Sequence, residues 1–279
     1  MQRILITGAT GNIGKHVVSG LKALGKEVRI GQRNRSDDPE ATFLDLSDPS
    51  SYDNALLGIS RLFLLRPPAI SNTSKTLNVL IDKAYSQGIE HIVFVSVSGA
   101  ESNSLVPHHA VEQKLIKSGR SYTILRPGFF SQNLESAYRM DILNDSCLYL
   151  PSGRGQINFI DTRDIAAVAV QALVNPEVHA RRAYTLAGKD ALTFYDVANL
   201  LSLELNRQIK YREASAFSYF IHLLRQGDPI MKAFIQTILH VGIRSGQANI
   251  ISSTASELLA RETITMGEYV HENREKWLC

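Results

Sequence analysis

The sequence predicts an α/β protein with a doubly wound parallel sheet, followed by a smaller, mostly helical C-terminal lobe. Short strands alternate with helices over the first half of the chain, which favours parallel pairing and right-handed crossovers. The strands are apolar nearly throughout, as expected when helices cover both faces of a sheet. With 279 residues, the chain is long enough for one large domain and an appended lobe.

The predicted elements follow a regular rhythm up to about residue 133. Strands are expected at 3–7, 27–32, 41–46, 61–65, 91–97 and 122–126, and helices at 13–24, 71–87 and 107–117. Gly25 and Gly88 stand where two of these helices should end. Further helices are expected at 164–174 and 194–205, a strand at 183–186, and mostly helix over 215–251.

This rhythm predicts two parts. The first is a sheet domain over residues 1–150, and residues 155–190 are expected to belong to it as well. The second is a helical lobe over 191–279. No linker rich in Pro, Gly or Ser separates them, so we expect the lobe to pack directly on the sheet domain. The cleft between the two is the expected ligand site.

Composition excludes several classes of partner. Apolar residues make up 44% and charged residues 20%, and the net charge of +3 is spread without a dense basic block. We therefore expect neither nucleic acid nor membrane as a partner. A strand beginning at Arg3 leaves no room for a signal peptide, and Cys147 and Cys279 form no metal or redox pattern. A cytoplasmic protein without a metal site is expected.

Three glycines carry the most specific signal in the chain. Gly8, Gly11 and Gly14 stand three apart, after a predicted strand and before a predicted helix. In this context the first glycine permits a tight turn, the second lets a pyrophosphate approach, and the third allows close helix–strand packing. The alternative is a turn that only connects the two elements. The residues expected to hold the phosphates of a Rossmann-type dinucleotide site are Gly8, Thr10, Gly11, Asn12, Ile13 and Gly14.

The end of the second strand indicates which dinucleotide is bound. A site for NAD carries an acid here to bind the ribose 2′-hydroxyl, whereas this chain has Arg33 and no acid before Asp37. A guanidinium binds a 2′-phosphate, so we predict NADPH, with Arg33 as the main ligand and Lys15 or Arg35 as helpers. The alternative is a solvated surface arginine. Asp45 is expected at the adenine edge, or else it only begins a turn.

Several segments together resemble the NmrA-like family of atypical short-chain dehydrogenase/reductases. They are the glycine loop, Arg33, and residues 64–68, 94–100, 122–130, 160–166, 186–188 and 265–270, so that nearly the whole chain apart from 215–251 is covered. Members of this family include NADPH-dependent reductases of quinones, triphenylmethane dyes and imines. Others are regulators that bind a dinucleotide without turning it over.

The resemblance also implies roles for individual residues. It suggests that the turn containing Leu65, Arg66 and Pro67 lies along the cofactor, and that Phe129 and Phe130 lie near the nicotinamide. The family resemblance extends to a His-x-x-x-Glu pattern on the helix over 107–117.

That helix lacks the Tyr-x-x-x-Lys pair of ordinary short-chain dehydrogenases. His108 and Glu112 stand four residues apart instead, on one helix face. A histidine beside a carboxylate could stay protonated near neutral pH and give a proton to the acceptor, so we predict a catalytic pair. The alternative is a structural glutamate and a near-surface histidine. Ser96, at the end of the fifth strand, is expected to bind the cofactor or to terminate the strand.

The function predicted is NADPH-dependent hydride transfer to a small or medium-sized conjugated, apolar acceptor of the quinone, imine or enone type. Hydride transfer needs mainly a cofactor held against an acceptor in a dry site. Phe217 and Phe220 in the lobe fit such an acceptor, although each could instead be core. Two alternatives are open: a redox-sensing regulator without turnover, and a non-redox enzyme on the same fold. No apolar stripe in the sequence indicates an oligomeric state.

Overall fold

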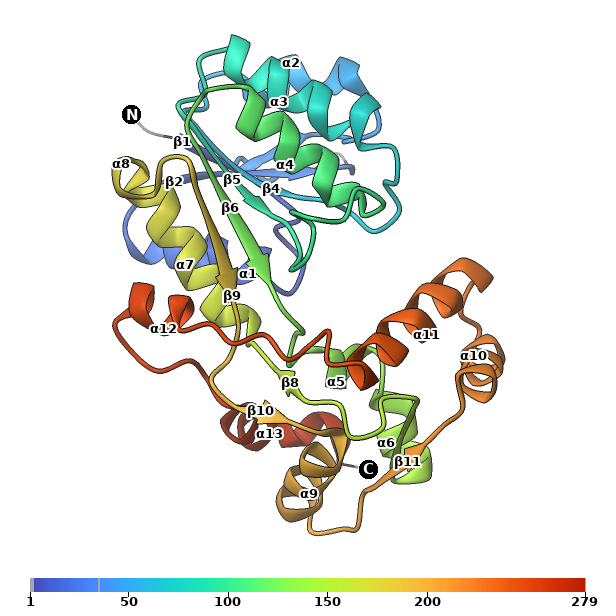
Figure 1. Cartoon of the computed structure of the whole chain (residues 1–279). Helices are drawn as coiled ribbons and strands as arrows, with labels where there is room; N and C mark the ends of the chain where they lie inside the picture. Colours follow the sequence, from blue (N-terminus) through green and yellow to red (C-terminus); the bar gives the residue numbers. More distant parts are fainter. Residues whose placement is uncertain (1–2, 35, 279) are drawn as a thin grey trace. The chain divides into compact units, whose positions relative to one another are not determined.

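The computed structural model describes residues 3–34 and 36–278 (Figure 1). The chain divides into two compact units. Unit 1 comprises Met1–Pro127 and Thr162–Leu186, and unit 2 comprises Gly128–Asp161 and Ala187–Cys279.

Unit 1 is built on a seven-stranded sheet in the order β3-β2-β1-β4-β5-β6-β9. The strands are β1 (Arg3–Thr7), β2 (Glu27–Gln32), β3 (Ala41–Phe43), β4 (Arg61–Leu65), β5 (His91–Val95), β6 (Tyr122–Pro127) and β9 (Arg182–Leu186). Neighbouring strands of this sheet run parallel throughout. The order reverses between β1 and β4, which is where open α/β sheets bind ligands. The predicted fold class is confirmed.

Helices cover both faces of this sheet, as the uniformly apolar strands require. They are α1 (Gly14–Ala23), α2 (Tyr52–Leu56), α3 (Leu77–Ser86), α4 (Pro107–Lys117), α7 (Thr162–Val174) and α8 (Pro176–His179), with 3₁₀ turns at Pro49–Ser51 and Thr73–Lys75. Figure 1 shows α1 and α7 on one face and α2, α3 and α4 on the other. Gly20 of α1 lies against Val170 of α7, so the absence of a side chain there lets the two helices approach closely.

Buried polar contacts explain why the segment after residue 161 belongs to unit 1. The Arg61 guanidinium on β4 donates hydrogen bonds to the carbonyl oxygens of Leu173 (2.5 Å) and Val174 (3.1 Å) at the end of α7. The hydroxyl of Thr123 on β6 donates to the carbonyl oxygen of His179 (2.8 Å). Since these carbonyls end helices, the side chains satisfy groups that have no partner within the helix. The contacts fix α7 and α8 to the sheet.

Unit 2 is a mixture of short strands and helices around its own apolar core. Its elements are α5 (Asn133–Ser136), α6 (Arg139–Asp145), β7 (Cys147–Leu150), β8 (Ile157–Asn158), β10 (Ala191–Leu192), α9 (Phe194–Leu205), β11 (Lys210–Glu213), α10 (Ala216–Arg225), α11 (Ile230–Arg244), α12 (Thr254–Leu259), α13 (Met266–Asn273) and a 3₁₀ turn at Arg274–Trp277. β7 pairs with β11 in parallel, and β8 pairs with β10 in antiparallel orientation.

The division between units differs from the one predicted at residue 150. Residues 128–161 belong to unit 2 because β7 pairs with β11, and because Leu134, Tyr138 and Ile142 are buried in the core of that unit. The stretch 215–251 is mainly helical as expected, but it forms two helices separated at Gly227 and Pro229. Among the described residues, none of the helices has both the length and the apolar character that a bilayer span requires.

Candidate functional site

The glycine loop of unit 1 joins the central strand β1 to helix α1. Gly8 has a positive φ of 65°, and its carbonyl oxygen accepts a hydrogen bond from the amide of Gly11 (3.0 Å), which closes a tight turn. The N-terminus of α1 has Ile13 as its cap residue, without a side-chain cap hydrogen bond. No hydrogen bond within the described chain engages the amides of Asn12, Ile13 and Gly14, so these amides remain available to an anion, and the helix dipole favours negative charge there.

Gly14 allows the close approach of helix and strand that the motif requires. A Cβ atom on Gly14 would lie 2.1 Å from the carbonyl oxygen of Gly8 and 2.9 Å from the Cα of Ala9. No real side chain tolerates such contacts with backbone atoms. The third glycine thus has the packing role expected from its position.

A cavity of about 660 Å³ opens beside this loop. It is lined by Thr7, Gly8, Ala9, Thr10, Ile30, Gly31, Gln32, Arg33, Asn34, Leu44, Asp45, Leu46, Ser47, Pro67, Pro68, Ala69 and Ile70. These residues come from the carboxyl ends of β1, β2 and β4 and from the segment after β3. The cavity lies within unit 1, where the strand order reverses.

The residues predicted to bind the cofactor fall into two groups. Gly8, Thr10, Arg33, Asp45 and Pro67 line the cavity, whereas Gly11, Asn12, Ile13, Gly14, Leu65, Arg66 and Ser96 do not. Leu65 lies close by, since a Cβ on Gly8 would meet its Cδ1 at 3.2 Å. The sequence did not predict that Ala69 and Ile70 form part of the cavity wall. Only the preceding Pro67-Pro68 turn indicated that the chain bends near this site.

Arg33 is exposed and lines the cavity. Within the described part of the chain, its guanidinium has no hydrogen-bond or ion-pair partner. Asp45 is the acidic residue of the cavity wall, and its Oδ1 accepts a hydrogen bond from the amide of Ser47 (2.8 Å). Asp45 therefore stabilises a turn, as one of the two predictions for it stated. The predicted helper Arg35 lies outside the described residues, and Lys15 is exposed on α1.

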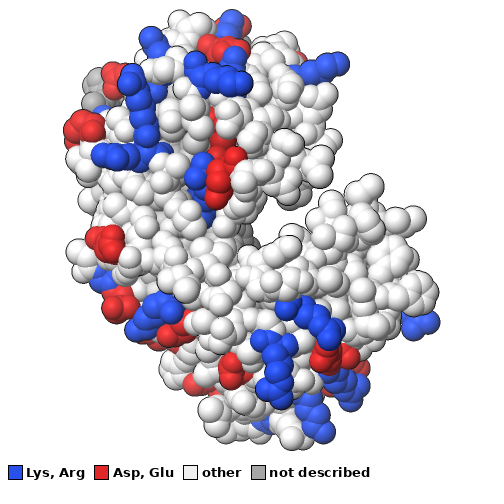
Figure 2. Space-filling model, in the orientation of Figure 1, with Lys and Arg blue, Asp and Glu red and all other residues white. Residues whose placement is uncertain are grey.

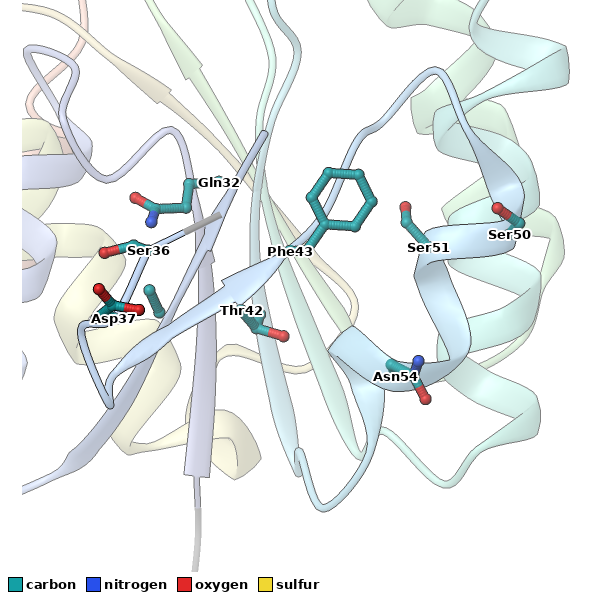
Figure 3. A pocket seen from close by; sticks show the side chains of 9 residues that line it. Gln32, Ser36, Asp37, Thr42, Phe43, Ser50, Ser51 and Asn54 are labelled. Atoms are coloured by element: carbon teal, nitrogen blue, oxygen red, sulfur yellow. The ribbon is translucent and has the colours of Figure 1, made fainter. Parts of the chain in front are cut away.

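A second cavity, of about 520 Å³, lies at the edge strand β3. Gln32, Ser36, Asp37, Ala41, Thr42, Phe43, Ser50, Ser51 and Asn54 line it. In Figure 3, Gln32, Ser36 and Asp37 lie on one side of β3, Ser50 and Ser51 on the other, and Phe43 between them. Among the described residues, this lining offers hydroxyls, amides and one carboxylate and includes no basic side chain.

Helix α4 carries His108 and Glu112, but the structure does not pair them. The Oε1 of Glu112 accepts a hydrogen bond from the Ser96 hydroxyl (2.5 Å), and its Oε2 accepts one from Nη2 of Arg126 (2.6 Å). Glu112 is fully buried, and its hydrogen bond raises the pKa of Arg126. This carboxylate joins the ends of β5 and β6 to α4.

His108 has a different partner. Its Nε2 accepts a hydrogen bond from Nε of Arg66 (3.2 Å), so Nδ1 carries the ring proton. Nδ1 is buried, with no partner among the described residues. Burial, and next the charge of Arg66, lowers the pKa of His108 from 6.5 to about 4. The prediction that a neighbouring carboxylate keeps His108 protonated near neutral pH is therefore wrong, because the neighbour is a cation and Glu112 is bound elsewhere.

Arg66 connects His108 to the wall of the cavity. Its Nη1 donates hydrogen bonds to the carbonyl oxygens of Pro67 (3.2 Å), Pro68 (3.3 Å) and Ile70 (2.6 Å). The cavity-lining turn after β4 is thus wrapped around one guanidinium. Ser96, which is buried, donates its hydroxyl hydrogen to Glu112.

The aromatic residues predicted to contact substrate all lie in unit 2. The ring of Phe129 packs edge-on against Phe159 (5.6 Å between centroids) and His240 (6.1 Å), and Phe220 is half-buried against the core of the unit. Phe130 is half-buried and bridges to Ile160. Phe217 on α10 is 76% exposed.

Sequence reasoning did not find the polar contacts that attach α10 and α11 to α6. The Tyr138 hydroxyl donates a hydrogen bond to Nε2 of His240, and Nδ1 of His240 donates to the carbonyl oxygen of Gln236 (2.6 Å). The carboxylate of Asp141 binds Nε2 of His222 at 3.0 Å. Two of these contacts, Tyr138 with His240 and Asp141 with His222, join residues far apart in the sequence, so no local pattern could reveal them.

The sheet order, the glycine loop and the adjoining cavity define a dinucleotide-binding α/β protein. The model of the NmrA-like family matches residues 1–270, and the chain belongs to that family. This confirms the family resemblance found in the sequence.

Relatives and solved structures extend this assignment. The chain is 34% identical over 219 residues to an NAD(P)H azoreductase of Xenophilus azovorans, covering 75% of this chain and 76% of that one. It is 26% identical over 277 residues to the uncharacterized oxidoreductase YesF of Bacillus subtilis, covering 98% and 96%. The structure of an NADPH-dependent quinone oxidoreductase of Escherichia coli complexed with NADPH matches with a TM-score of 0.86 and 26% identity, covering 96% and 99%. These relatives are oxidoreductases, as the prediction of an enzyme class requires.

Proposed function

We propose that the chain is an NADPH-dependent reductase that transfers hydride to a small or medium-sized conjugated, apolar acceptor of the quinone, imine or enone type. One observation carries the preference for NADPH: an exposed arginine without a partner in the described chain lines the cavity at the end of β2, where NAD-binding sites place an acid. The solved relative bound to NADPH supports the same choice.

The residues present fit a dinucleotide diphosphate. The N-terminus of α1 and the amides of Asn12, Ile13 and Gly14 would hold the pyrophosphate, and Arg33 would hold the 2′-phosphate by charge-assisted hydrogen bonds. When bound, NADPH supplies the hydride. The chain's own part is to hold the reacting partners together and to exclude water.

His108 takes a positioning role in this proposal. A neutral imidazole that accepts a hydrogen bond from Arg66 is a poor proton donor at neutral pH. It instead fixes the guanidinium around which the turn over 67–70 is wrapped. Water can protonate the oxygen of a reduced quinone, so no acidic side chain is needed for such acceptors.

The acceptor end of the site is proposed in unit 2. Phe129, Phe130, Phe217 and Phe220 offer aromatic surface to a conjugated acceptor, and the high exposure of Phe217 leaves its ring free for such a contact. The azoreductase and the quinone oxidoreductase, by their names, act on conjugated acceptors.

The test is a titration of the full chain with NADPH and with NADH, followed by NADPH absorbance after addition of a quinone panel. We expect NADPH to bind at least about tenfold more tightly than NADH, and to be consumed steadily with at least one quinone. Tight binding without turnover would identify a dinucleotide sensor. Product formed without loss of NADPH would identify a non-redox enzyme.

Substitution of Arg33 tests the cofactor preference directly. Arg33→Asp should weaken NADPH binding by about 30-fold, or roughly 2 kcal/mol, and change NADH binding by less than about threefold, because only NADPH has the 2′-phosphate. Arg182→Asp is the matched control, since Arg182 is exposed on β9 at the opposite edge of the same sheet. Equal losses for both dinucleotides would remove Arg33 from this role.

A further inference from the structure

One buried carboxylate fixes a guanidinium at the carboxyl end of the sheet in unit 1. Arg126 lies at the end of β6, where its Nε and Nη2 donate hydrogen bonds to the carboxylate of Glu112 at 2.6 to 3.2 Å. Glu112 is fully buried, and its Oε1 also accepts a hydrogen bond from the Ser96 hydroxyl just after β5. A planar guanidinium that is held along one edge by a carboxylate has a defined orientation. The fold therefore sets the direction in which Arg126 offers its remaining donors.

The opposite edge of the Arg126 guanidinium is open. A guanidinium has five N–H groups, and the pair with Glu112 engages Nε and Nη2. No hydrogen bond or ion pair within the described chain engages Nη1. Among the described residues, the buried side-chain atoms without a partner include Nε of Arg61 but not Nη1 of Arg126, so solvent reaches Nη1. The whole side chain is only 15% exposed, so this edge offers N–H donors from a largely enclosed position.

The end of β6 lies on the side of the sheet where the nicotinamide half of the proposed cofactor is expected. The glycine loop follows β1 and Arg33 follows β2, which assigns the adenosine half to the β2 side of β1. A doubly wound sheet binds the other half on the opposite side of the point where the strand order reverses, along β4, β5 and β6. Neighbouring strands are about 4.8 Å apart, so β6 lies about 14 Å from β1, at the far end of that half. An acceptor would meet the nicotinamide there.

The charges around Arg126 favour a neutral oxygen ligand over an anion. Glu101, with 44% of its side chain exposed, lies 3.4 Å from Nε of Arg126, in addition to the buried Glu112. One guanidinium and two carboxylates leave a net negative charge on this cluster, which repels a ligand that carries a carboxylate or a sulfonate. Over unit 1, the upper part of Figure 2, positive and negative side chains are interspersed on the face shown, without a large field of one sign to attract an anion.

Reduction of a quinone creates a charge that an N–H donor at this position would stabilise. Hydride addition, with the hydride supplied by NADPH, converts a neutral quinone into a hydroquinone anion whose charge lies on oxygen. Water then supplies the proton, and the dinucleotide leaves as NADP⁺. A fixed donor binds the developing oxyanion more strongly than the neutral carbonyl oxygen, and such differential binding lowers a barrier. A cationic acceptor becomes neutral in the same step and gains nothing from the donor.

We propose that Arg126 is a catalytic residue that binds the reacting oxygen of a neutral quinone through Nη1, while Glu112 holds its guanidinium in place. This assignment rests on the proposed reductase function and narrows its acceptor class to neutral quinones. Phe129, which is proposed to contact the acceptor, follows Arg126 by three residues in the sequence.

The catalytic role is tested with Arg126→Lys, which keeps a positive charge beside Glu112 but removes the planar edge with Nη1. With 1,4-naphthoquinone, we expect kcat to fall by at least about 30-fold, because an oxyanion donor is lost. The Kd of the same quinone in the presence of NADP⁺, where no reaction is possible, should rise by less than about fivefold, because the neutral oxygen needs the donor less. Stopped-flow absorbance and calorimetric titration of the full chain measure the two effects.

Two further variants separate this role from a structural one. Arg61→Lys is the matched control, since Arg61 is a buried guanidinium at the amino end of β4 that binds carbonyl oxygens of α7. It should lower the melting temperature and leave kcat within about threefold of wild type. The double variant Arg126→Gln with Glu112→Gln leaves no unpaired buried charge, and it should lose at least as much kcat as Arg126→Lys.

The preference for a neutral acceptor is tested with Glu101→Gln. For 1,4-naphthoquinone-2-sulfonate, kcat/KM should rise by about threefold, whereas that for 1,4-naphthoquinone should change by less than about twofold, because only the sulfonate is repelled by Glu101. Glu27→Gln is the matched control, since Glu27 is 43% exposed and pairs with Arg3 at the amino end of the sheet. An unchanged ratio of the two quinones in Glu101→Gln would overturn the preference.

The outcomes distinguish this assignment from the proposed function. If the wild-type chain consumes NADPH with 1,4-naphthoquinone and Arg126→Lys does so equally fast, Arg126 is not the catalytic residue, while the reductase function stands. Equal losses of kcat in Arg126→Lys and Arg61→Lys would give Arg126 a structural role only. If the wild-type chain consumes no NADPH with any quinone, both proposals are overturned.

Discussion

The two units differ in where their functional features come from. In unit 1 the proposed dinucleotide pocket is built around backbone groups at the ends of adjacent parallel strands, and the loop that shapes it is continuous in sequence. In unit 2 the notable features depend on contacts between distant segments, such as Tyr138 with His240. Unit 1 exposes large apolar side chains singly, for example Leu24, Leu57 and Leu105, whereas unit 2 gathers them on α11. Local motifs thus reveal the first kind of site, and only the folded chain reveals the second.

The largest expected effect lies in the glycine loop. Gly14→Ala would place Cβ 2.1 Å from the Gly8 carbonyl oxygen, so the loop must shift. We expect NADPH affinity to fall by at least about 100-fold and the free energy of unfolding to fall by about 3 kcal/mol. Fluorescence titration and urea denaturation measure the two effects. Unchanged NADPH binding would show that the loop does not hold the phosphates.

A similar backbone approach in unit 2 gives a matched test. Gly155→Ala would place Cβ 2.1 Å from the carbonyl oxygen of Ile243 and displace the end of α11. We expect a loss of about 2–3 kcal/mol in the free energy of unfolding, with NADPH affinity within about threefold of wild type. If Gly155→Ala lost as much NADPH affinity as Gly14→Ala, the assignment of the proposed cofactor site to unit 1 would be contradicted.

The smallest expected effect concerns pH. Burial lowers the pKa of His108 to about 4 in the folded chain, against 6.5 when unfolded, so the unfolded state binds more protons between these values. The contribution of His108 to stability is complete above pH 6.5 and is lost as the pH falls toward 4. His91 and His240 behave in the same way, because burial lowers the pKa of each to about 4.

Replacement of one of these histidines measures how much it contributes to the pH dependence of the free energy of unfolding. Between pH 7 and 4.5 the wild-type free energy of unfolding should fall, and in His108→Gln it should fall by about 1–2 kcal/mol less. Urea denaturation at several pH values gives both slopes. The same variant tests the positioning role: kcat with a quinone at pH 7 should change by less than about tenfold. A larger fall in kcat, with stability unchanged, would restore His108 as the proton donor.

The sequence was informative where structure is local. The strand–glycine loop–helix order over 3–24 and the alternation up to β6 depend on short-range patterns, and the structure follows them. The helix over 107–117 was also correct, yet the relation of His108 to Glu112 was not. Spacing of four places two side chains on one helix face, but their rotamers follow the partners that the sheet provides, here Arg66, Ser96 and Arg126.

Unit 2 was less predictable for physical reasons. Its strands have two to four residues, too few for a periodic signal, and β7 gains its partner only from Lys210–Glu213, far along the chain. The exposure of apolar side chains along α11 was not predicted, because an apolar helical stretch cannot show which of its faces the fold will bury.

Arg33, the proposed ligand of the 2′-phosphate, illustrates how a residue that sets coenzyme preference can be independent of the fold. Since its guanidinium has no hydrogen-bond or ion-pair partner in the described chain, replacing it breaks no such interaction there, and the free energy of unfolding should remain nearly unchanged. If Arg33 binds the 2′-phosphate as proposed, we expect that coenzyme preference can be altered without compensating substitutions elsewhere. A change of preference toward NADH, whether by evolution or by engineering, would begin at this exposed position, because substitution there is expected to cost little stability.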